Sequence, residues 1–436
     1  MQFGPVVPAD VTAPHIGIAG VVVYTLVFAA VAIATARKPI LAVVALLLLD
    51  PFAYYQAIGV TTLTLSKIAL VAAIGGLAFR KVPLHALKSV PVARLAIAVL
   101  LVAAATALSG LHAAFPAPVV RETLKWIEYA VILGACAIAF SEDPDEVLIR
   151  WSVLVVTATV IALSIPEIIL GAHSGLIIAH TEVPRIAGPL EGPNQLAGYL
   201  GLMLPLLLAY TLMQGWRWPE IFVISAGILA TCMTFSRGGL VALALALLLV
   251  ALTCARSSAA RIAFGAAVLA VLAGAGVAWR VVAGGIGLVT SAPHHRVEIH
   301  GGLGTRRDLW RAAIQLWRAH PAWGIGAGNY ELEVGKLLHA PIRTHANSLY
   351  LQSLVEGGIP LLAATVFLIS SSIVTFVRGA RTPLAVAALT ASVALAVHFI
   401  LDLLVFYPKV GGQWMILLGL AAADIARRLR QPVATN

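Results

Sequence analysis

Residues 221–254 read IFVISAGILATCMTFSRGGLVALALALLLVALTC. This stretch consists of two apolar runs, 221–235 and 240–254, which are joined by four residues that include Arg237. At 1.5 Å per residue, each run forms a helix of about 22 Å, which is shorter than the hydrocarbon core of about 30 Å. The stretch is too long for one crossing, so we expect two short spans with Arg237 below the outer membrane surface. A cation at that depth usually lines a polar cavity, and the alternative is that it extends to the lipid headgroups.

The whole chain shares this apolar character. Of its 436 residues, 60% are hydrophobic and 11% are charged, whereas about 25% of the residues of a soluble domain are charged. This composition excludes a cytosolic enzyme, and helices are the economical way to satisfy a backbone in lipid. We predict an all-α, polytopic integral membrane protein with about 12 transmembrane helices. The apolar stretches, which allow 12 or 13 spans, lie at 16–35, 39–56, 62–79, 95–110, 126–140, 148–171, 195–213, 219–235, 239–254, 262–283, 347–377, 383–402 and 412–426.

The basic residues indicate the orientation. The net charge is +10, but the cations are dispersed between apolar runs and form no stripe with aromatic residues, so no nucleic acid partner is expected. If all 13 stretches cross, alternate short connections are basic, and the positive-inside rule places them in the cytoplasm. The N-terminus then lies outside, whereas 12 spans would place it inside. The inner cations are Arg37, Lys38, Arg80, Lys81, Lys88, Arg94, Arg150, Arg217, Arg256, Arg261, Arg378, Arg381, Arg427, Arg428 and Arg430.

One outward connection, 284–345, is much longer than the others. Loops of this length translocate largely regardless of their charge, and they are uncommon unless they are functional. Apolar residues recur within it at helical spacing, with arginines opposite, so we predict an amphipathic helix over 306–318, and a membrane-surface helix is one interpretation. Its apolar positions are Leu309, Trp310, Ala313, Ile314 and Trp317. The chain thus divides into 1–283 with transmembrane helices 1 to about 10, the loop 284–345, and 346–436 with the C-terminal transmembrane helices and a cytoplasmic tail.

The outward segments carry a series of short motifs, RIAGP (185–189), GPNQLA (192–197), SRGG (236–239), RDLW (307–310), PAWGIG (321–326), HANSLYLQ (345–352) and EGGIP (356–360). Together these motifs resemble the O-antigen ligase superfamily. They follow the expected order over about residues 180–360, with a long loop between late spans. The resemblance implies a GT-C-like glycosyltransferase architecture, with the long loop and its short helices in the periplasm. It also implies transfer of a glycan from undecaprenyl diphosphate on the periplasmic side of the bacterial inner membrane.

Arginine is the expected ligand for the diphosphate, because it binds phosphate bidentately and keeps its charge. Together with the resemblance, this selects Arg185, Arg237 and Arg307, which come from three separate outward segments. Arg306 can take the place of Arg307. Contact with lipid headgroups is the alternative for Arg185 and Arg307.

Histidine is the natural general base for an acceptor hydroxyl, because its pKa lies near neutrality. Many members of the superfamily carry a His-Asn pair where this chain has Asn347 and Ser348, so His345 is the expected base and His339 is the second candidate. His339 and Asn347 are further candidates for substrate binding. A loop histidine with only backbone or headgroup contacts is the alternative. Asp402 either orients a base, pairs with an arginine, or is a helix-end carboxylate in water.

We expect neither a cofactor nor a metal ion. Of the outward acidic residues, only Glu331 and Glu333 have the spacing of a metal-binding pair, and arginines can supply the charge that a metal would provide. The run GIGAGN (324–329) is similar to a phosphate-binding loop, but it follows no predicted strand. We interpret it as a turn that allows close backbone packing.

The leading hypothesis is an O-antigen ligase, which joins the glycan to lipid A-core oligosaccharide in a metal-independent, inverting displacement. The alternatives within the superfamily are an O-antigen polymerase and a protein O-oligosaccharyltransferase. A lipid-linked sugar transporter is the alternative from another class. The expected partners are the undecaprenyl diphosphate-linked glycan, the lipid A-core oligosaccharide and membrane lipids.

Overall fold

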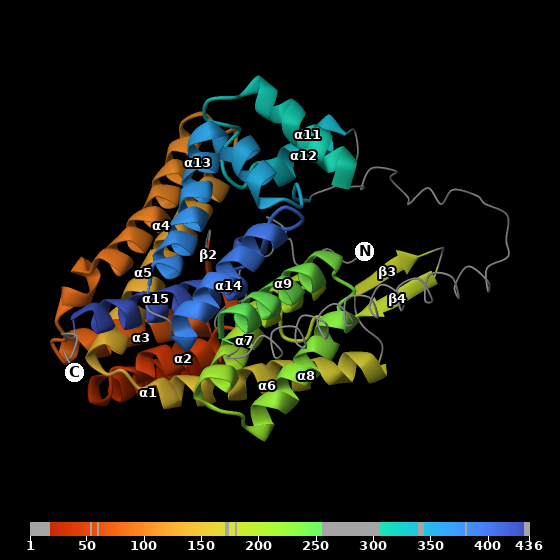
Figure 1. Cartoon of the computed structure of the whole chain (residues 1–436). Coiled ribbons are helices and arrows are strands. Elements are labelled where there is room, and N and C mark those ends of the chain that lie inside the picture. Colours follow the sequence, from red (N-terminus) through yellow and green to blue (C-terminus); the bar gives the residue numbers. More distant parts are fainter. Residues whose placement is uncertain are drawn as a thin grey trace.

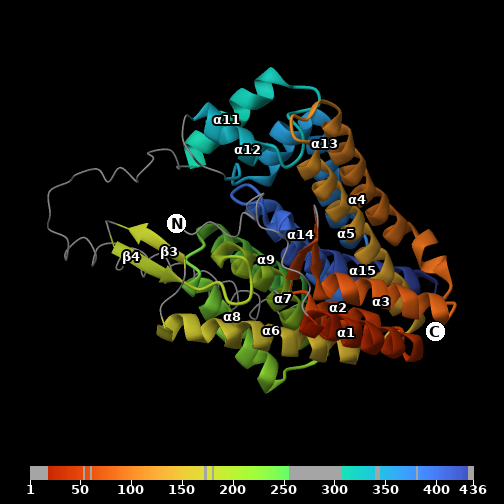
Figure 2. The same ribbon diagram turned by 180° about the vertical axis from the view of Figure 1, so that it is seen from behind.

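The protein folds into a bundle of helices with two small β-hairpins (Figures 1 and 2). The structure is a computed structural model, and it describes residues 18–52, 55–58, 61–170, 174–178, 181–254, 306–338, 344–379 and 382–430. Within these residues, seven helices are long and apolar enough to cross a membrane, and α3, α8 and α14 are shorter apolar helices. The prediction of an all-α membrane protein is confirmed. The predicted span 262–283 lies outside the described residues.

The elements follow one another along the chain with short connections. The first half contains α1 (Ile18–Arg37), α2 (Leu41–Leu49), β1 (Tyr55–Ile58), β2 (Thr61–Thr64), α3 (Leu65–Phe79), η1 (Leu84–Lys88), α4 (Val90–Leu108), η2 (Ser109–His112), α5 (Pro116–Glu142) and α6 (Glu146–Leu170). The second half contains β3 (Ser174–Ile178), β4 (Thr181–Arg185), α7 (Pro193–Gln214), α8 (Trp218–Met233), α9 (Arg237–Cys254), α11 (Arg306–Ala319), α12 (Tyr330–Leu337), α13 (Leu349–Val377), α14 (Pro383–His398), η3 (Leu404–Phe406) and α15 (Pro408–Arg430).

The apolar stretch 221–254 forms two helices, as predicted. Helix α8 ends at Met233 and α9 begins at Arg237, and Phe235 between them has a positive φ of 50°. Few residues other than glycine adopt that backbone conformation, so the turn between the two helices is tight. The Arg237 side chain is exposed at the start of α9.

The predicted span over 39–56 is wrong. Helix α2 has nine residues, about 14 Å, and its C-cap is Asp50. Asp50 is still helical (φ −61°, ψ −39°), but Pro51 follows and has no N–H to continue the helical hydrogen bonds. The chain then enters the β1–β2 hairpin, in which Tyr55 pairs with Thr64, and it returns through α3. The described residues therefore do not reach the expected number of about 12 spans.

The short basic connections meet at one end of the bundle. Lys38 Nζ lies 2.7 Å from Asp145 Oδ2, which joins the α1–α2 turn to the α5–α6 turn. Arg428 lies 3.2 Å from Glu146, which brings the end of α15 to the same place. Helix α5 starts at the opposite end, where Phe115 N donates to Asn329 Oδ1 at 2.9 Å beside α12. The bundle therefore has a basic end and an opposite end that carries α11 and α12 (Figure 1).

Helix α13 is broken near its start. Gly358 has φ +62°, and Pro360 two residues later has no N–H to donate to the Glu356 carbonyl. Backbone N–H groups from another segment replace the missing donors: Ile325 N donates to Val355 O at 3.0 Å and Gly326 N donates to Glu356 O at 2.9 Å. The 324–329 run is thus a turn for close packing, as predicted.

The predicted amphipathic helix is α11. Its buried residues Leu309, Ala312 and Ala313 form a small core with Tyr330 of α12 and Val355 of α13. Tyr330 Oη donates to Leu309 O at 2.7 Å, which ties the two short helices together. Part of the apolar face of this helix therefore packs against protein, whereas Trp310, Ile314 and Trp317 are only half-buried. A membrane-surface position stays a prediction. We call residues 306–338 the α11–α12 lobe; Figure 2 shows it beside the start of α13.

The break in α13 predicts a sharp sensitivity at Gly358. A Cβ there would lie 2.2 Å from Ala322 O in a positive-φ conformation, so Gly358→Ala is expected to lower the free energy of unfolding by about 2 kcal/mol or more. Gly201→Ala in α7 is the matched control, because a Cβ there meets nothing within 4 Å and alanine favours a helix by up to about 1 kcal/mol. Thermal unfolding in detergent measures both variants, and equal melting temperatures would contradict this account.

Candidate active site

The residues 399–407 between α14 and α15, which we call the junction segment, receive hydrogen bonds from several helices. Leu349 N at the start of α13 donates to Phe399 O at 2.9 Å and to Asp402 O at 3.2 Å. From α5, Tyr129 Oη donates to Val405 O at 2.8 Å and Lys125 Nζ donates to Phe406 O at 3.0 Å. A buried loop must have its backbone groups satisfied in this way. The junction segment therefore joins the start of α13 to α5.

On one side of the junction segment, Arg185 and Asp402 are joined through Asn194. Arg185 Nε donates to Thr234 O at 2.6 Å, and one of its terminal nitrogens donates to Asn194 Oδ1 at 2.9 Å. Asn194 Nδ2 in turn donates to Asp402 Oδ2. Asp402 is 5% exposed, so the interpretation of a helix-end carboxylate in water is wrong.

Charges around this array favour a negative partner. Burial raises the pKa of Asp402, and the attraction of Arg306 and Arg185 opposes that rise. Burial lowers the pKa of Arg185, with attraction from Asp402 and repulsion from Arg306 as smaller causes. Arg306 at the start of α11 therefore acts on both groups. We call Arg185, Asn194, Arg306 and Asp402 the arginine array.

Arg237 and Arg307 are the other two predicted arginines. Arg237 begins α9, whose next residue packs on the bend before the junction segment: a Cβ on Gly238 would lie 3.1 Å from His398 Cδ2. Arg307 is exposed on α11 and makes no polar contact with the described part of the chain. Arg306 rather than Arg307 thus belongs to the array.

His345 lies on the other side of the junction segment. Its ring centroid is 4.3 Å from that of Phe406 and 6.5 Å from that of Tyr407. Its Nδ1 is buried and has no hydrogen-bond partner among the described residues. Burial lowers the pKa of His345 to about 4, while Glu122 raises it and Lys125 lowers it by smaller amounts. The imidazole is therefore neutral at pH 7, which is the form that a general base needs.

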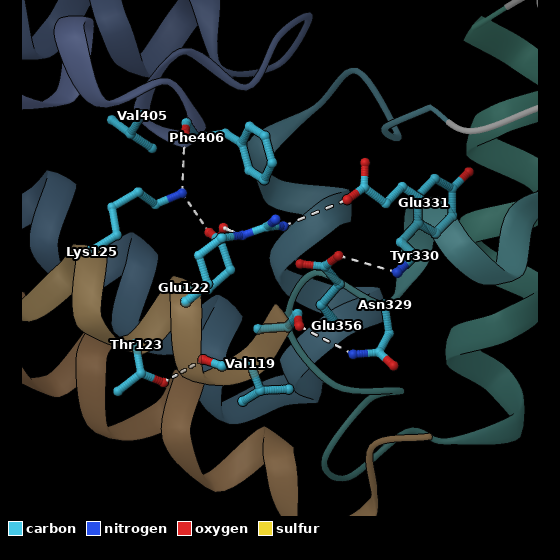
Figure 3. Close-up of polar contacts among 12 residues, drawn as sticks. Val119, Glu122, Thr123, Lys125, Asn329, Tyr330, Glu331, Glu356, Val405 and Phe406 are labelled. Atoms are coloured by element: carbon cyan, nitrogen blue, oxygen red, sulfur yellow. Dashed lines mark hydrogen bonds and ion pairs between the residues drawn. The ribbon is translucent and has the colours of Figure 1, made fainter. Parts of the chain in front are cut away.

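A charged group on α5 faces this histidine. Lys125 Nζ contacts Glu122 Oε2 and lies 4.3 Å above the Phe406 ring. Arg121 lies 3.7 Å from Glu122 and 3.6 Å from Glu331 of α12. Figure 3 shows Lys125, Glu122 and Glu331 between α5 and the α11–α12 lobe. The two cations and the two carboxylates balance, so the histidine side of the junction segment carries little net charge.

Residues 221–366 match the family model described as O-antigen ligase. This stretch, about a third of the chain, is similar to O-antigen ligases. No curated protein matches the chain. The matched region includes Arg237, Arg306 and His345, while Arg185 and Asp402 lie outside it. Members of that family are glycosyltransferase-like enzymes. The long apolar helices of this chain indicate a multi-pass membrane protein.

Some residues of the candidate site are not found by sequence reasoning. Asn194 lies within the GPNQLA motif, but its role as a bridge depends on Asp402, which is 208 residues away. Lys125 is a second such residue. It follows Glu122 by three residues in an apolar helix, and this spacing, which brings two side chains together on a helix, could have predicted the pair. Asn347 has φ +50° and marks a tight bend after His345. His339 lies outside the described residues.

The burial of His345 predicts an unusual titration. With a pKa of about 4, the imidazole stays neutral at pH 5, where an unperturbed histidine with a pKa of about 6.5 is mostly protonated. The folded state is therefore destabilised as the pH falls from 6.5 toward 4, because the unfolded chain binds the proton more tightly. NMR of histidine-labelled protein in nanodiscs, assigned by difference against His345→Gln, measures the midpoint. A midpoint near 6.5 would show that the ring is hydrated.

Proposed function

We propose that this protein is an O-antigen ligase that transfers a glycan from undecaprenyl diphosphate to lipid A-core oligosaccharide. One observation carries the proposal: His345 and the arginine array contact the same junction segment, His345 at Phe406 and the array through Asp402. A base and a set of phosphate-binding cations are the two groups that this displacement requires. The match of residues 221–366 to O-antigen ligases supports the same chemistry.

In the proposed reaction, His345 takes the proton of the acceptor hydroxyl. The oxygen of that hydroxyl attacks the anomeric carbon of the donor at the same time. The new glycosidic C–O bond forms as the C–O bond to the diphosphate breaks, so the configuration inverts. The bound diphosphate adds negative charge near the site, and a nearby negative charge raises the pKa of an imidazole. His345 therefore becomes a stronger base when the donor is present.

The arginines stabilise the diphosphate as it leaves. Arg185 is held in place by Thr234 O and by Asn194, so its orientation is set before the substrate binds. Arg306 and Arg237 add charge from two other elements, and Arg307 and Asn347 remain candidates for substrate contacts. Groups that are fixed in advance cost no reorganisation during the reaction. We infer that this charge takes the role of a metal ion, and that transfer is metal-independent.

The location follows from the same reasoning. The basic end of the bundle faces the cytoplasm by the positive-inside rule, so the junction segment and the α11–α12 lobe face the periplasm. The protein is then a multi-pass protein of the bacterial inner membrane with about 12 spans when the residues outside the described ranges are included. The donor lipid approaches from the membrane and the acceptor from the outer leaflet.

Loss of the base should abolish transfer. We expect His345→Ala to lower the rate with purified donor and lipid A-core by at least about 100-fold, which is within the range of a general base, and the wild type to stay active in chelator. His320→Ala is the control, because this histidine is exposed at the end of α11. Full activity of His345→Ala would overturn the assignment, and loss of wild-type activity in chelator would overturn metal independence.

The products of this assay, together with a measurement of flux into liposomes, distinguish the ligase from the alternative functions. Elongation of lipid-linked glycan with lipid A-core left unmodified would identify a polymerase, and glycan on a protein acceptor would identify an oligosaccharyltransferase. Flux of lipid-linked sugar into liposomes without a covalent product would identify a transporter.

Replacement of Arg185 should act mainly on the donor. Arg185→Lys keeps the charge but loses the planar pair of donors, so we expect the KM for the donor to rise about 10-fold, and Arg185→Ala to lower kcat as well. Arg378→Ala at the basic end is the matched control. An unchanged KM and kcat in both Arg185 variants would contradict a role in diphosphate binding.

A further inference from the structure

The backbone of the segment that carries His345 is bonded to the side chain of Gln352. The segment lies outside any helix, and Asn347 with its positive φ bends it into the start of α13. Ala346, next to the histidine, is fully buried, and its N–H donates to Gln352 Oε1 at 2.8 Å. The backbone beside His345 is therefore fixed by a residue one turn into α13.

The amide nitrogen of Gln352 also has a hydrogen-bond partner. Its Nε2 donates to Glu356 Oε1 at 2.7 Å, one helical turn further along α13. The N–H groups of Tyr330 and Gly328 also point to this carboxyl group, the former at 3.2 Å. Gln352 and Glu356 are 4% and 6% exposed, so water does not compete strongly for these bonds. The result is a buried chain from Ala346 through Gln352 and Glu356 to the α11–α12 lobe, part of which Figure 3 shows.

We propose that Gln352 and Glu356 are positioning residues that hold the His345 segment against the junction segment and relate it to the α11–α12 lobe. This inference rests on the proposed role of His345 as the base. Neither side chain contacts His345 directly, so both act through the backbone of Ala346. A misplacement of about 1 Å in a reacting group can cost about 100-fold in rate.

A cavity of about 40 Å³ lies beside the two tethering side chains, between α4, α5, α13 and the junction segment. Its polar lining residues include Gln352, Glu356, Glu122 and Lys125, and Phe406, whose ring packs against His345, lines it as well. Without the bond to Gln352, the buried Ala346 N–H would lose its partner, and a buried unpaired donor is costly. The Gln352 side chain could also turn into the cavity if its bonds were lost.

Residue 352 has to accept one hydrogen bond and donate another, and the amide of glutamine does both. The side chain must accept from Ala346 N at one atom and donate to Glu356 at the other, and a carboxylate cannot donate. Gln352→Glu therefore places two carboxyl groups against each other, and two ionised carboxylates, which form at high pH, cannot bond to one another. Adding Glu356→Gln restores a donor between the two side chains, with their roles reversed, although the Tyr330 N–H then loses part of its acceptor.

Gln352→Leu tests the tether with little change in volume. We expect kcat to fall by about 10- to 100-fold, with the KM for the donor changed by less than about 3-fold, because the loss is in orientation. Ser353→Ala is the matched control: Ser353 is the next residue of α13, lines the same cavity and bonds to Thr365 Oγ1 at 3.1 Å. Its activity should equal that of the wild type.

The pH profile separates positioning from a general loss of structure. The charged groups that face His345 are Glu122, Lys125 and Arg121 of α5, and Phe406 and Tyr407 are its ring neighbours. None of these changes in Gln352→Leu, so only the hydration of the ring differs. We expect the acid limb of kcat/KM to move from near pH 4 toward 6.5 in this variant and to stay in place in Ser353→Ala.

The exchange variants complete the test. Gln352→Glu should lose at least about 10-fold in kcat, and the double variant Gln352→Glu/Glu356→Gln should recover at least about 5-fold of that loss. Wild-type kcat and an unmoved acid limb in Gln352→Leu, or no recovery in the double variant, would overturn the positioning role. Full activity of His345→Ala would instead overturn the proposed function, so the two failures are distinguishable.

Discussion

The break in α13 at Gly358 and Pro360 is the constraint on which the site depends. A helix that loses its internal donors must find others in a membrane protein, where water does not reach the backbone. Here Ile325 and Gly326 supply them. Three glycines with positive φ, Gly324, Gly326 and Gly328, allow that segment to approach so closely. The backbone hydrogen bonds of one helix thus dictate where the α11–α12 lobe docks.

The same few residues connect the lobe to the candidate active site. The backbone of Glu356 accepts from Gly326, its side chain accepts from Tyr330, and the two helical turns before it carry Gln352 and the start of α13 at Leu349. Leu349 in turn donates to the junction segment. These contacts share one short piece of helix. It therefore couples the position of the lobe to the positions of the histidine segment and the junction segment.

The sequence predicted the parts of the fold that local patterns control. Apolar length predicted the helices α8 and α9 with a turn before Arg237, and apolar spacing predicted α11. The pattern failed at 39–56, where a proline outweighs apolar composition, and it could not tell whether α11 packs on lipid or on protein. For the site, the motifs selected Arg185 and His345 as candidates. They could not identify Asn194 as the bridge to Asp402 or Gln352 as a tether, because those roles arise from partners that only the tertiary fold brings near.

The distribution of charge assigns the two proposed substrates to two sides of the junction segment. On the side of Arg185, two cations act on one buried carboxylate, Asp402, and Arg237 begins a neighbouring helix. A site with surplus positive charge in a partly buried setting attracts a diphosphate. On the side of His345, the cations of α5 are matched by Glu122 and Glu331. That side has little attraction for phosphate, so an uncharged sugar hydroxyl competes successfully for the histidine. The proposed base is thereby kept apart from the leaving group and free for the acceptor.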